Sequence, residues 1–223
     1  MKLFVVALDE EIQKDFLNNF DLNVINNSNY YFLKSNNNFA FIFSNVGKVN
    51  SSISLTKAIC DLKKIDLIIN IGSCGCADSN INILQTCLVK SSQFLDVDLS
   101  IFGYELNQMR SNPKLFSTSL EYSNKLKEFI NFDNVDCIVG TSDSFISKQN
   151  YNNFLDIKNI NLIDMELASL CAVANMFKIE IVSIKVVSDS LFNKNESIFD
   201  YEQNQKIFSK KISELILKIS KNL

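Results

Sequence analysis

Short apolar runs alternate along the chain with segments in which apolar residues recur at helical spacing. Most of the runs are continuously apolar, as expected for strands that are buried on both faces of a sheet. The predicted strands are Leu3–Leu8, Phe39–Ser44, Leu67–Ile71, Thr86–Lys90, Asp136–Gly140, Asn161–Met165 and Ile179–Ser188. The predicted helices are Lys48–Leu62, Ser117–Phe129, Glu166–Met176 and a closing helix with Ile207, Ile212, Leu215, Ile216 and Ile219 on one face. This alternation predicts an α/β fold.

The least periodic region, at about residues 92–116, contains aromatic residues and the only proline, Pro113. It is typical of a long loop rather than of a domain boundary. The sequence contains no internal repeat and no linker, so we expect residues 1–223 to form a single domain.

Composition narrows the functional classes. The 223 residues are 47% hydrophobic and 21% charged, with a formal net charge of -3, so nothing in the charge favours nucleic acid or an anionic membrane as a partner. The apolar run at residues 3–8 is too short to span a bilayer, and it meets Asp9, Glu10 and Glu11 where a signal peptide would stay apolar. We therefore expect a cytoplasmic protein with reduced cysteines.

The chain contains no histidine. This excludes Ser-His-Asp and Cys-His nucleophilic systems and histidine-ligated metals, so any acid-base chemistry must come from carboxylates, Lys, Tyr or Cys. Cys74-Gly-Cys76 has no second cysteine pair nearby, and a zinc site is therefore not expected. No motif indicates an organic cofactor.

Asp164-Met165-Glu166 interrupts what otherwise reads as a buried strand that leads into a helix. Burial of a carboxylate is costly unless it is paired or hydrogen-bonded, so these side chains should face a cavity that receives a polar ligand. The alternative is a helix N-terminus, with Asp164 as the N-cap and Glu166 in the first turn.

Three further strand ends carry polar or flexible residues, and ligands gather at the C-terminal ends of strands in α/β sheets. These segments are 9–11 (Asp-Glu-Glu), 70–75 (Asn-Ile-Gly-Ser-Cys-Gly) and 186–189 (Val-Val-Ser-Asp). Taken singly, each has a structural interpretation: a helix cap, a glycine turn and an N-cap. Gly47-Lys48 lacks the upstream glycine and the following Ser or Thr of a phosphate-binding P-loop.

In this order, the segments resemble the successive motifs of the 5′-methylthioadenosine/S-adenosylhomocysteine nucleosidases, within the purine nucleoside phosphorylase superfamily. The matching segments are 6–11 (VALDEE), 44–49 (SNVGKV), 69–75 (INIGSCG), 96–104 (DVDLSIFGY), 142–146 (SDSFI), 164–168 (DMELA) and 187–189 (VSD). The resemblance implies a mixed, partly closed central sheet flanked by helices. It also implies a homodimer that hydrolyses the N-glycosidic bond of the two named nucleosides, and of 5′-deoxyadenosine as a further candidate, to release adenine.

The resemblance assigns three catalytic carboxylates. Asp189 would promote protonation of adenine at N7, Glu11 would position and deprotonate the attacking water, and Glu166 would hold the ribose hydroxyls and favour the developing positive charge. These roles need neither histidine nor a cofactor.

The resemblance also implies substrate contacts. Asp164 and Met165 would contact the ribose, Phe145 would stack on adenine with the Ile146 backbone at its edge, and Ser188 would orient Asp189. The 72–75 turn would close the water side of the site through Ser73, Cys74 and Gly75. Val46, with Phe102 and Tyr104 reaching across the dimer from the neighbouring subunit, would cover the 5′-alkylthio group.

The sequence departs from the family pattern at Asp164, Cys74, Cys76 and Leu95, where the family has Glu, a small residue, Gly and His. Two alternatives remain open. One is a phosphorylase that uses phosphate instead of water, with Lys48 and Lys185 as candidate phosphate ligands. The other is a catalytically silent nucleoside-binding protein.

Overall fold

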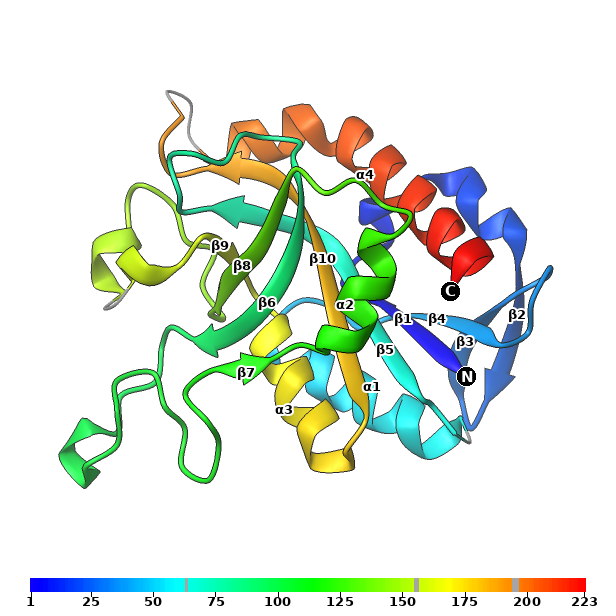
Figure 1. The fold of residues 1–223 in the computed structure, drawn as a ribbon, viewed down its shortest axis with the longest axis horizontal. Coiled ribbons are helices and arrows are strands. Elements are labelled where there is room, and N and C mark those ends of the chain that lie inside the picture. Colours follow the sequence, from blue (N-terminus) through cyan, green and yellow to red (C-terminus); the bar gives the residue numbers. More distant parts are fainter. Residues whose placement is uncertain (63, 155–156, 194–196) are drawn as a thin grey trace.

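In the computed structural model, which describes residues 1–62, 64–154, 157–193 and 197–223, the strands form one mixed sheet (Figure 1). The strands are β1 (Lys2–Val6), β2 (Phe20–Ile25), β3 (Ser28–Leu33), β4 (Phe39–Phe43), β5 (Leu67–Cys76), β6 (Thr86–Phe94), β7 (Phe116–Ser117), β8 (Asn134–Thr141), β9 (Leu162–Asp164) and β10 (Glu180–Ser190). The α-helices are α1 (Lys48–Asp61), α2 (Leu120–Lys127), α3 (Leu167–Phe177) and α4 (Ser197–Asn222), and the 3-10 helices are η1 (Asp9–Glu11), η2 (Lys14–Asn19), η3 (Ser100–Phe102), η4 (Tyr151–Asn153) and η5 (Ile157–Asn159). All seven predicted strands and all four predicted helices are present with shifted ends.

Part of the sheet closes on itself. The order β10-β6-β8-β9-β5 forms a ring, because β10 also pairs with β5, and β1, β4, β3 and β2 extend from β5 as an open wing. Parallel pairs such as β1 with β5 occur beside antiparallel ones such as β10 with β6. The expected mixed, partly closed sheet with flanking helices is confirmed.

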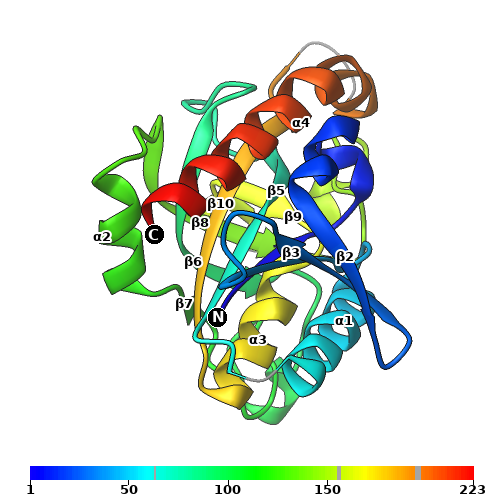
Figure 2. The same cartoon turned by 90° about the vertical axis from the view of Figure 1, so that its right-hand side faces the viewer.

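Both faces of the sheet are covered, which explains the continuously apolar strand sequences. In β1, Leu3 and Val5 belong to the apolar cluster that includes α1 and α3, whereas Phe4 and Val6 belong to the cluster that includes α4. Figure 2 shows α1 and α3 on one side of the strands and α4 along the other.

The sequence pattern did not predict β2, β3 and β7. β2 and β3 form a hairpin at the open end of the sheet, and most side chains of β2 are exposed, so the apolar signal is weak there. Their connection contains Asn26 and Asn27 at φ 48° and 64°, a backbone conformation that asparagine tolerates better than most residues.

The expected glycine turn at residues 72–75 was wrong. β5 continues through this segment to Cys76, and β10 pairs with it along its whole length, from Glu180 opposite Leu67 to Ser190 opposite Cys76. The glycines therefore lie within a strand, where a missing side chain allows a neighbouring group to approach closely.

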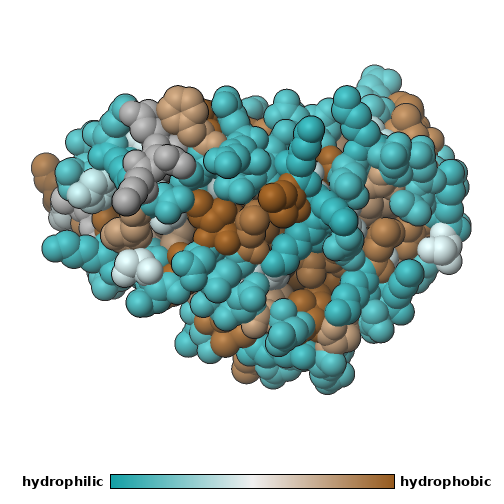
Figure 3. Space-filling model, turned by 90° about the horizontal axis from the view of Figure 1, so that it is seen from above, coloured by the Kyte–Doolittle hydropathy of each residue, from teal (hydrophilic) through white to brown (hydrophobic). Residues whose placement is uncertain are grey.

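The predicted aromatic loop is shorter than expected, because β6 extends to Phe94. The following segment, which includes η3, projects away from the sheet at the lower left of Figure 1. Viewed from above, hydrophilic side chains cover most of the surface, with separate apolar patches between them (Figure 3). Within the described parts of the chain, no helix is both long and apolar enough to cross a membrane.

Candidate active site

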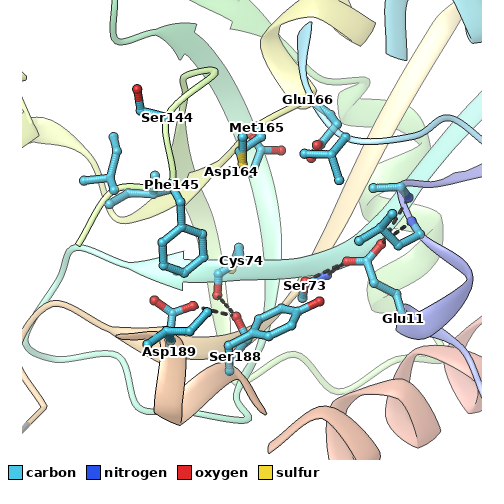
Figure 4. Close-up of a pocket in the computed structure, with 18 of the residues that line it drawn as sticks. Glu11, Ser73, Cys74, Ser144, Phe145, Asp164, Met165, Glu166, Ser188 and Asp189 are labelled. Atoms are coloured by element: carbon cyan, nitrogen blue, oxygen red, sulfur yellow. Dashed lines mark hydrogen bonds between the residues drawn. The ribbon is translucent and has the colours of Figure 1, made fainter. Parts of the chain in front are cut away.

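A cavity of about 300 Å³ lies where the C-terminal ends of β1, β5 and β10 meet the loops after β4 and β8. Twelve of the fourteen predicted site residues line it. They are Glu11, Val46, Ser73, Cys74, Gly75, Phe145, Ile146, Asp164, Met165, Glu166, Ser188 and Asp189. Close-up, the three predicted catalytic carboxylates approach the cavity from different elements (Figure 4).

Glu11 lies in η1, directly after β1, and its buried carboxylate accepts four hydrogen bonds. The amides of Ala7 and Leu8 donate to Oε2 at 3.1 and 3.2 Å, and the amide and hydroxyl of Ser73 each donate to Oε1 at 2.6 Å (Figure 4). A Cβ on Gly72 would lie 2.9 Å from Oε1. The glycine in β5 therefore provides the room that this carboxylate occupies.

An irregularity in β10 determines the direction of the Asp189 side chain. The register with β5 shifts between Val187 and Asp189, as in a β-bulge, which changes the direction of a side chain relative to a regular strand. The hydroxyl of Ser188 lies 2.7 Å from Asp189 Oδ1 and 3.0 Å from the Cys74 carbonyl oxygen. A Cβ on Gly75 would lie 3.3 Å from Asp189 Oδ2, so the second glycine of the segment makes room for this carboxylate.

The aromatic side chain of Phe145 lies beside Asp189. Phe145 follows β8, and its ring points toward Cys74 and Asp189 (Figure 4). Its side chain is 44% exposed, whereas Ile146 is buried in a small apolar cluster with Leu95. An exposed aromatic face over a cavity suits a flat ring as ligand.

Asp164 lines the cavity, but its oxygens already have protein partners. Oδ1 accepts from the Thr141 hydroxyl at 2.6 Å, and Oδ2 accepts from the Leu167 amide at 3.0 Å and forms an ion pair with Lys185 Nζ at 2.7 Å. The carboxylate therefore accepts from the first amide of α3, but the helix-terminus interpretation is wrong in its details, because the N-cap is Glu166 rather than Asp164 and Glu166 does not lie in the first turn. Its contact with a ribose stays a prediction.

Glu166 occupies the N-cap position of α3, and its buried side chain faces the cavity. Its Oε1 accepts a hydrogen bond of 3.0 Å from the Gly47 amide. Burial, and secondarily the negative charge of Asp164, raise the pKa of Glu166 to about 8, against the opposing influence of Lys185 and the Gly47 amide. For Lys185, burial disfavours the ammonium, but the attraction of Asp164 and Glu166 outweighs it and raises the pKa of the side chain.

The sequence analysis missed part of the lining. The additional residues are Ala7, Leu8, Glu10, Ser144, Ile163, Ile198 and Tyr201. Tyr201 lies in α4, upstream of the apolar positions that predicted this helix, and its phenol interacts with Ser73. Burial, followed by the charge of Glu11, raises the pKa of Tyr201 to about 12, so the phenol keeps its proton at neutral pH. Nothing in its local sequence marks it as a site residue.

Phe102 and Tyr104 do not line this cavity. Phe102 ends η3 and is 74% exposed, and Tyr104 follows on the projecting segment. Their expected contribution to a neighbouring subunit's site stays a prediction.

The arrangement permits acid-base chemistry on a small polar ligand. One carboxylate lies beside an aromatic wall, and the other two face the cavity from η1 and α3. In the described ranges, no cluster of three His, Cys, Asp or Glu side chains has the arrangement of a metal site.

Comparison with known proteins places this geometry in a family. The sequence profile of the phosphorylase superfamily matches residues 4–221. The 5′-methylthioadenosine/S-adenosylhomocysteine nucleosidase of Buchnera aphidicola subsp. Schizaphis graminum is 32% identical over 237 aligned positions, covering 100% of this chain and 97% of the relative.

Solved structures show the same fold. A crystal structure described as a 5′-methylthioadenosine/S-adenosylhomocysteine nucleosidase from Borrelia burgdorferi, bound to adenine, has a TM-score of 0.85 and 25% identity, with 100% of both chains covered. The futalosine hydrolase of Helicobacter pylori has a TM-score of 0.86 at 18% identity, covering 100% of this chain and 98% of that chain. At that identity the likeness is one of fold alone.

Proposed function

The chain belongs to the phosphorylase superfamily and, within it, to the family of 5′-methylthioadenosine/S-adenosylhomocysteine nucleosidases, and on this premise we propose that it hydrolyses the N-glycosidic bond of these two nucleosides and releases adenine. The observation that carries the proposal is the convergence of Glu11, Glu166 and Asp189 on one cavity with an aromatic side chain at one end. 5′-Deoxyadenosine is a further candidate substrate.

Each carboxylate has a role that suits its surroundings. Asp189, beside Phe145, promotes protonation of the departing adenine. Glu11, with Ser73 as its partner, positions the attacking water and removes its proton. Glu166 holds the ribose hydroxyls and, when ionised, stabilises the positive charge that develops on the sugar.

Water is favoured over phosphate as the nucleophile by the positions of the cations. A phosphate dianion needs concentrated positive charge or several free amide donors. Lys185 is paired with Asp164, and Lys48 is paired with Asp96. Arg110, the only arginine, is exposed on the projecting segment. A silent binding protein is disfavoured because all three carboxylates are present in the cavity.

The deciding experiment is adenine release from 5′-methylthioadenosine and S-adenosylhomocysteine by the purified protein, in phosphate-free buffer and again with phosphate added. We expect adenine with free methylthioribose or ribosylhomocysteine in both buffers. A sugar 1-phosphate that forms only with phosphate would make the protein a phosphorylase. Binding without adenine release in either buffer would support the silent binder.

The proposal includes a cytoplasmic location, a single domain over residues 1–223 and a homodimer in which Phe102 and Tyr104 cover the neighbouring subunit's site. Large exposed apolar side chains on the projecting segment, including Ile101 at 87% and Phe102 at 74% exposure, are consistent with a partner surface. Sedimentation of the protein and of Phe102→Ser tests the dimer: we expect a dimer for the former and a weaker one for the latter, whereas a monomeric parent would contradict it.

A further inference from the structure

We propose that Lys48 is a positioning residue: by bridging Asp96 and Asp143, it holds the neighbouring Gly47 amide against the carboxylate of Glu166. We call Lys48, Asp96 and Asp143 the Lys48 clasp. The inference rests on the proposed function, because it assigns the clasp a role in the same reaction, and none of the three residues is among those that line the cavity.

The clasp is held by both the side chain and the backbone of Lys48. Its ammonium Nζ lies 2.6 Å from Asp96 Oδ1 and 3.5 Å from Asp143 Oδ2, and its amide donates to Asp143 Oδ1 at 2.7 Å. The side chains of Lys48 and Asp96 are only 19% and 25% exposed. The side chain of Asp143 is 51% exposed, so the contact with Asp96 is the better shielded of the two that the ammonium makes.

The residue between the clasp and the cavity is a glycine with a restricted position. Gly47 has φ 95°, a region that residues with a side chain rarely adopt, and a Cβ there would lie 3.2 Å from Asp143 Oδ1. Its amide donates to Glu166 Oε1 at 3.0 Å. Because Lys48 follows Gly47 directly, the three contacts that hold Lys48 also restrict the position of this amide.

The clasp joins three loops that are distant in the sequence. Lys48 begins α1 after the β4 loop, Asp96 follows β6, and Asp143 follows β8, two residues before Phe145. Asp96 Oδ2 also accepts from the Ser142 hydroxyl at 3.1 Å and from the Asp143 amide at 3.2 Å. Without the ammonium, the β4 loop loses its contact with Asp96, and the unscreened carboxylates of Asp96 and Asp143 repel each other, so the loop that carries Gly47 should be less firmly held against the loops after β6 and β8.

The Gly47 amide matters because Glu166 is otherwise in unfavourable surroundings for a charge. The charged groups that face it are Asp164 from the end of β9, Lys185 from β10 and Glu11 from η1, and it is nearly fully buried. Two of these three neighbours are negative. The amide is thus one of the few favourable influences on the ionised form, and its displacement should raise the pKa of Glu166 further.

The test compares Lys48→Met with Lys48→Arg, which keeps the charge, and with Lys57→Met as a matched control. Lys57 is on the same helix, and its ion pair with Asp61 at 2.7 Å lies away from the cavity lining. Two readouts are needed: kcat and KM for adenine release as a function of pH, and the titration of the Glu166 carboxyl by carbon-13 NMR without substrate, assigned by comparison with Glu166→Gln.

We expect Lys48→Met to raise the titration midpoint of Glu166 by about one pH unit. The rise of kcat/KM with pH, which follows ionisation of Glu166, should move to higher pH by the same amount, so kcat/KM near neutral pH should fall roughly tenfold. In Lys48→Arg, the Glu166 midpoint and kcat/KM should stay close to the parent values, and in Lys57→Met both should be unchanged. An unchanged Glu166 midpoint in folded Lys48→Met would overturn the inference. If Lys48→Met fails to fold, Asp96→Leu, which removes the acceptor that lies 2.6 Å from the Lys48 ammonium, decides by the same measurement.

The NMR titration separates this inference from the proposed function. A parent protein that releases no adenine would contradict the proposed function, while the Glu166 midpoint in the Lys48 variants would still decide whether the clasp positions the Gly47 amide. A tenfold activity loss without any shift of the midpoint would count against the clasp and leave the proposed function standing.

Discussion

Glu11 and Glu166 are two glutamates of one cavity, and the protein surrounds them in opposite ways. Glu11 accepts four hydrogen bonds, two from backbone amides at the end of β1 and two from Ser73. Glu166 accepts one from the Gly47 amide and lies beside the negative Asp164, and its pKa is raised by burial to about 8. One carboxyl is surrounded by donors, and the other is desolvated.

This contrast shows how one residue type serves two tasks. The folded protein provides four hydrogen-bond donors that hold the Glu11 carboxylate in one orientation, and this suits the positioning of a water molecule. Glu166 is buried and accepts one hydrogen bond from the protein, so a ribose that donates hydroxyl hydrogen bonds, or a sugar that becomes positive, stabilises its charged form further. The energetic difference between the two sites is therefore expected to appear in mutants and in pH dependence.

The largest expected effect is that of Glu11→Gln. The variant keeps the size of the side chain but cannot remove a proton, and its amide NH₂ would face the donors at Ala7 and Leu8. We expect kcat for adenine release to fall about 10³-fold, within the range for loss of a general base. Adenine itself should bind with nearly unchanged affinity, because Phe145 and Asp189 lie in other elements. A loss of less than tenfold would assign water activation to another group.

Glu166→Gln should alter the pH dependence of stability as well as activity. An unfolded glutamate has a pKa of about 4.3, and the folded value is about 8, so between these values the folded state holds one more proton. Protonated Glu166 therefore contributes to the free energy of unfolding in full at the acidic end of this pH range. The contribution is lost as pH rises through the range, by at most about 1.4 kcal/mol per pH unit. In the variant this loss should disappear.

The measurement is urea unfolding of the parent and of Glu166→Gln at several pH values between 5 and 8. The free energy of unfolding of the variant, relative to the parent, should increase with pH. Glu214→Gln serves as the control, since Glu214 is exposed on α4. Parallel curves for the parent and Glu166→Gln would show that Glu166 is ionised throughout this range.

The buried strands and most of the cavity could be predicted from the sequence. Continuous apolar runs identified the buried strands because both sheet faces are covered, and the chemistry at four strand ends identified most of the cavity. The half-exposed hairpin of β2 and β3 lacked that signal, although Asn26-Asn27 is compatible with its turn.

Contacts between distant segments were not predictable from local patterns. Gly72 and Gly75 look like a turn, but their function is to make room for Glu11 and Asp189, which come from other elements. Likewise, Lys185 is a strand residue with no local sign of its ion pair with Asp164. Leu95, where the family resemblance leads one to expect histidine, is buried against Gly140.

Gly72→Ala should break the arrangement around Glu11 without removing any functional group. The new Cβ would lie 2.9 Å from Glu11 Oε1, so the carboxylate must shift and weaken its hydrogen bonds with Ser73. We expect about a tenfold lower kcat, since displacements below 1 Å already impair a positioned catalytic group. Steady-state kinetics together with the melting temperature check this. A normal rate in a folded variant would mean that Glu11 tolerates displacement.

Ser73→Ala should have the smallest effect of the series. It removes the hydroxyl donor at 2.6 Å from Glu11 Oε1 but leaves the Ser73 amide and the amides of Ala7 and Leu8 in place. Because three of the four donors remain, we expect kcat to fall only about threefold to tenfold, near the net contribution of one ordinary hydrogen bond and below that of an isolated bond to a charged group. Combining Ser73→Ala with Glu11→Gln should cost little beyond Glu11→Gln alone, since the hydroxyl acts through that carboxylate. Fully multiplicative losses in the double mutant would instead give Ser73 a role of its own with the substrate.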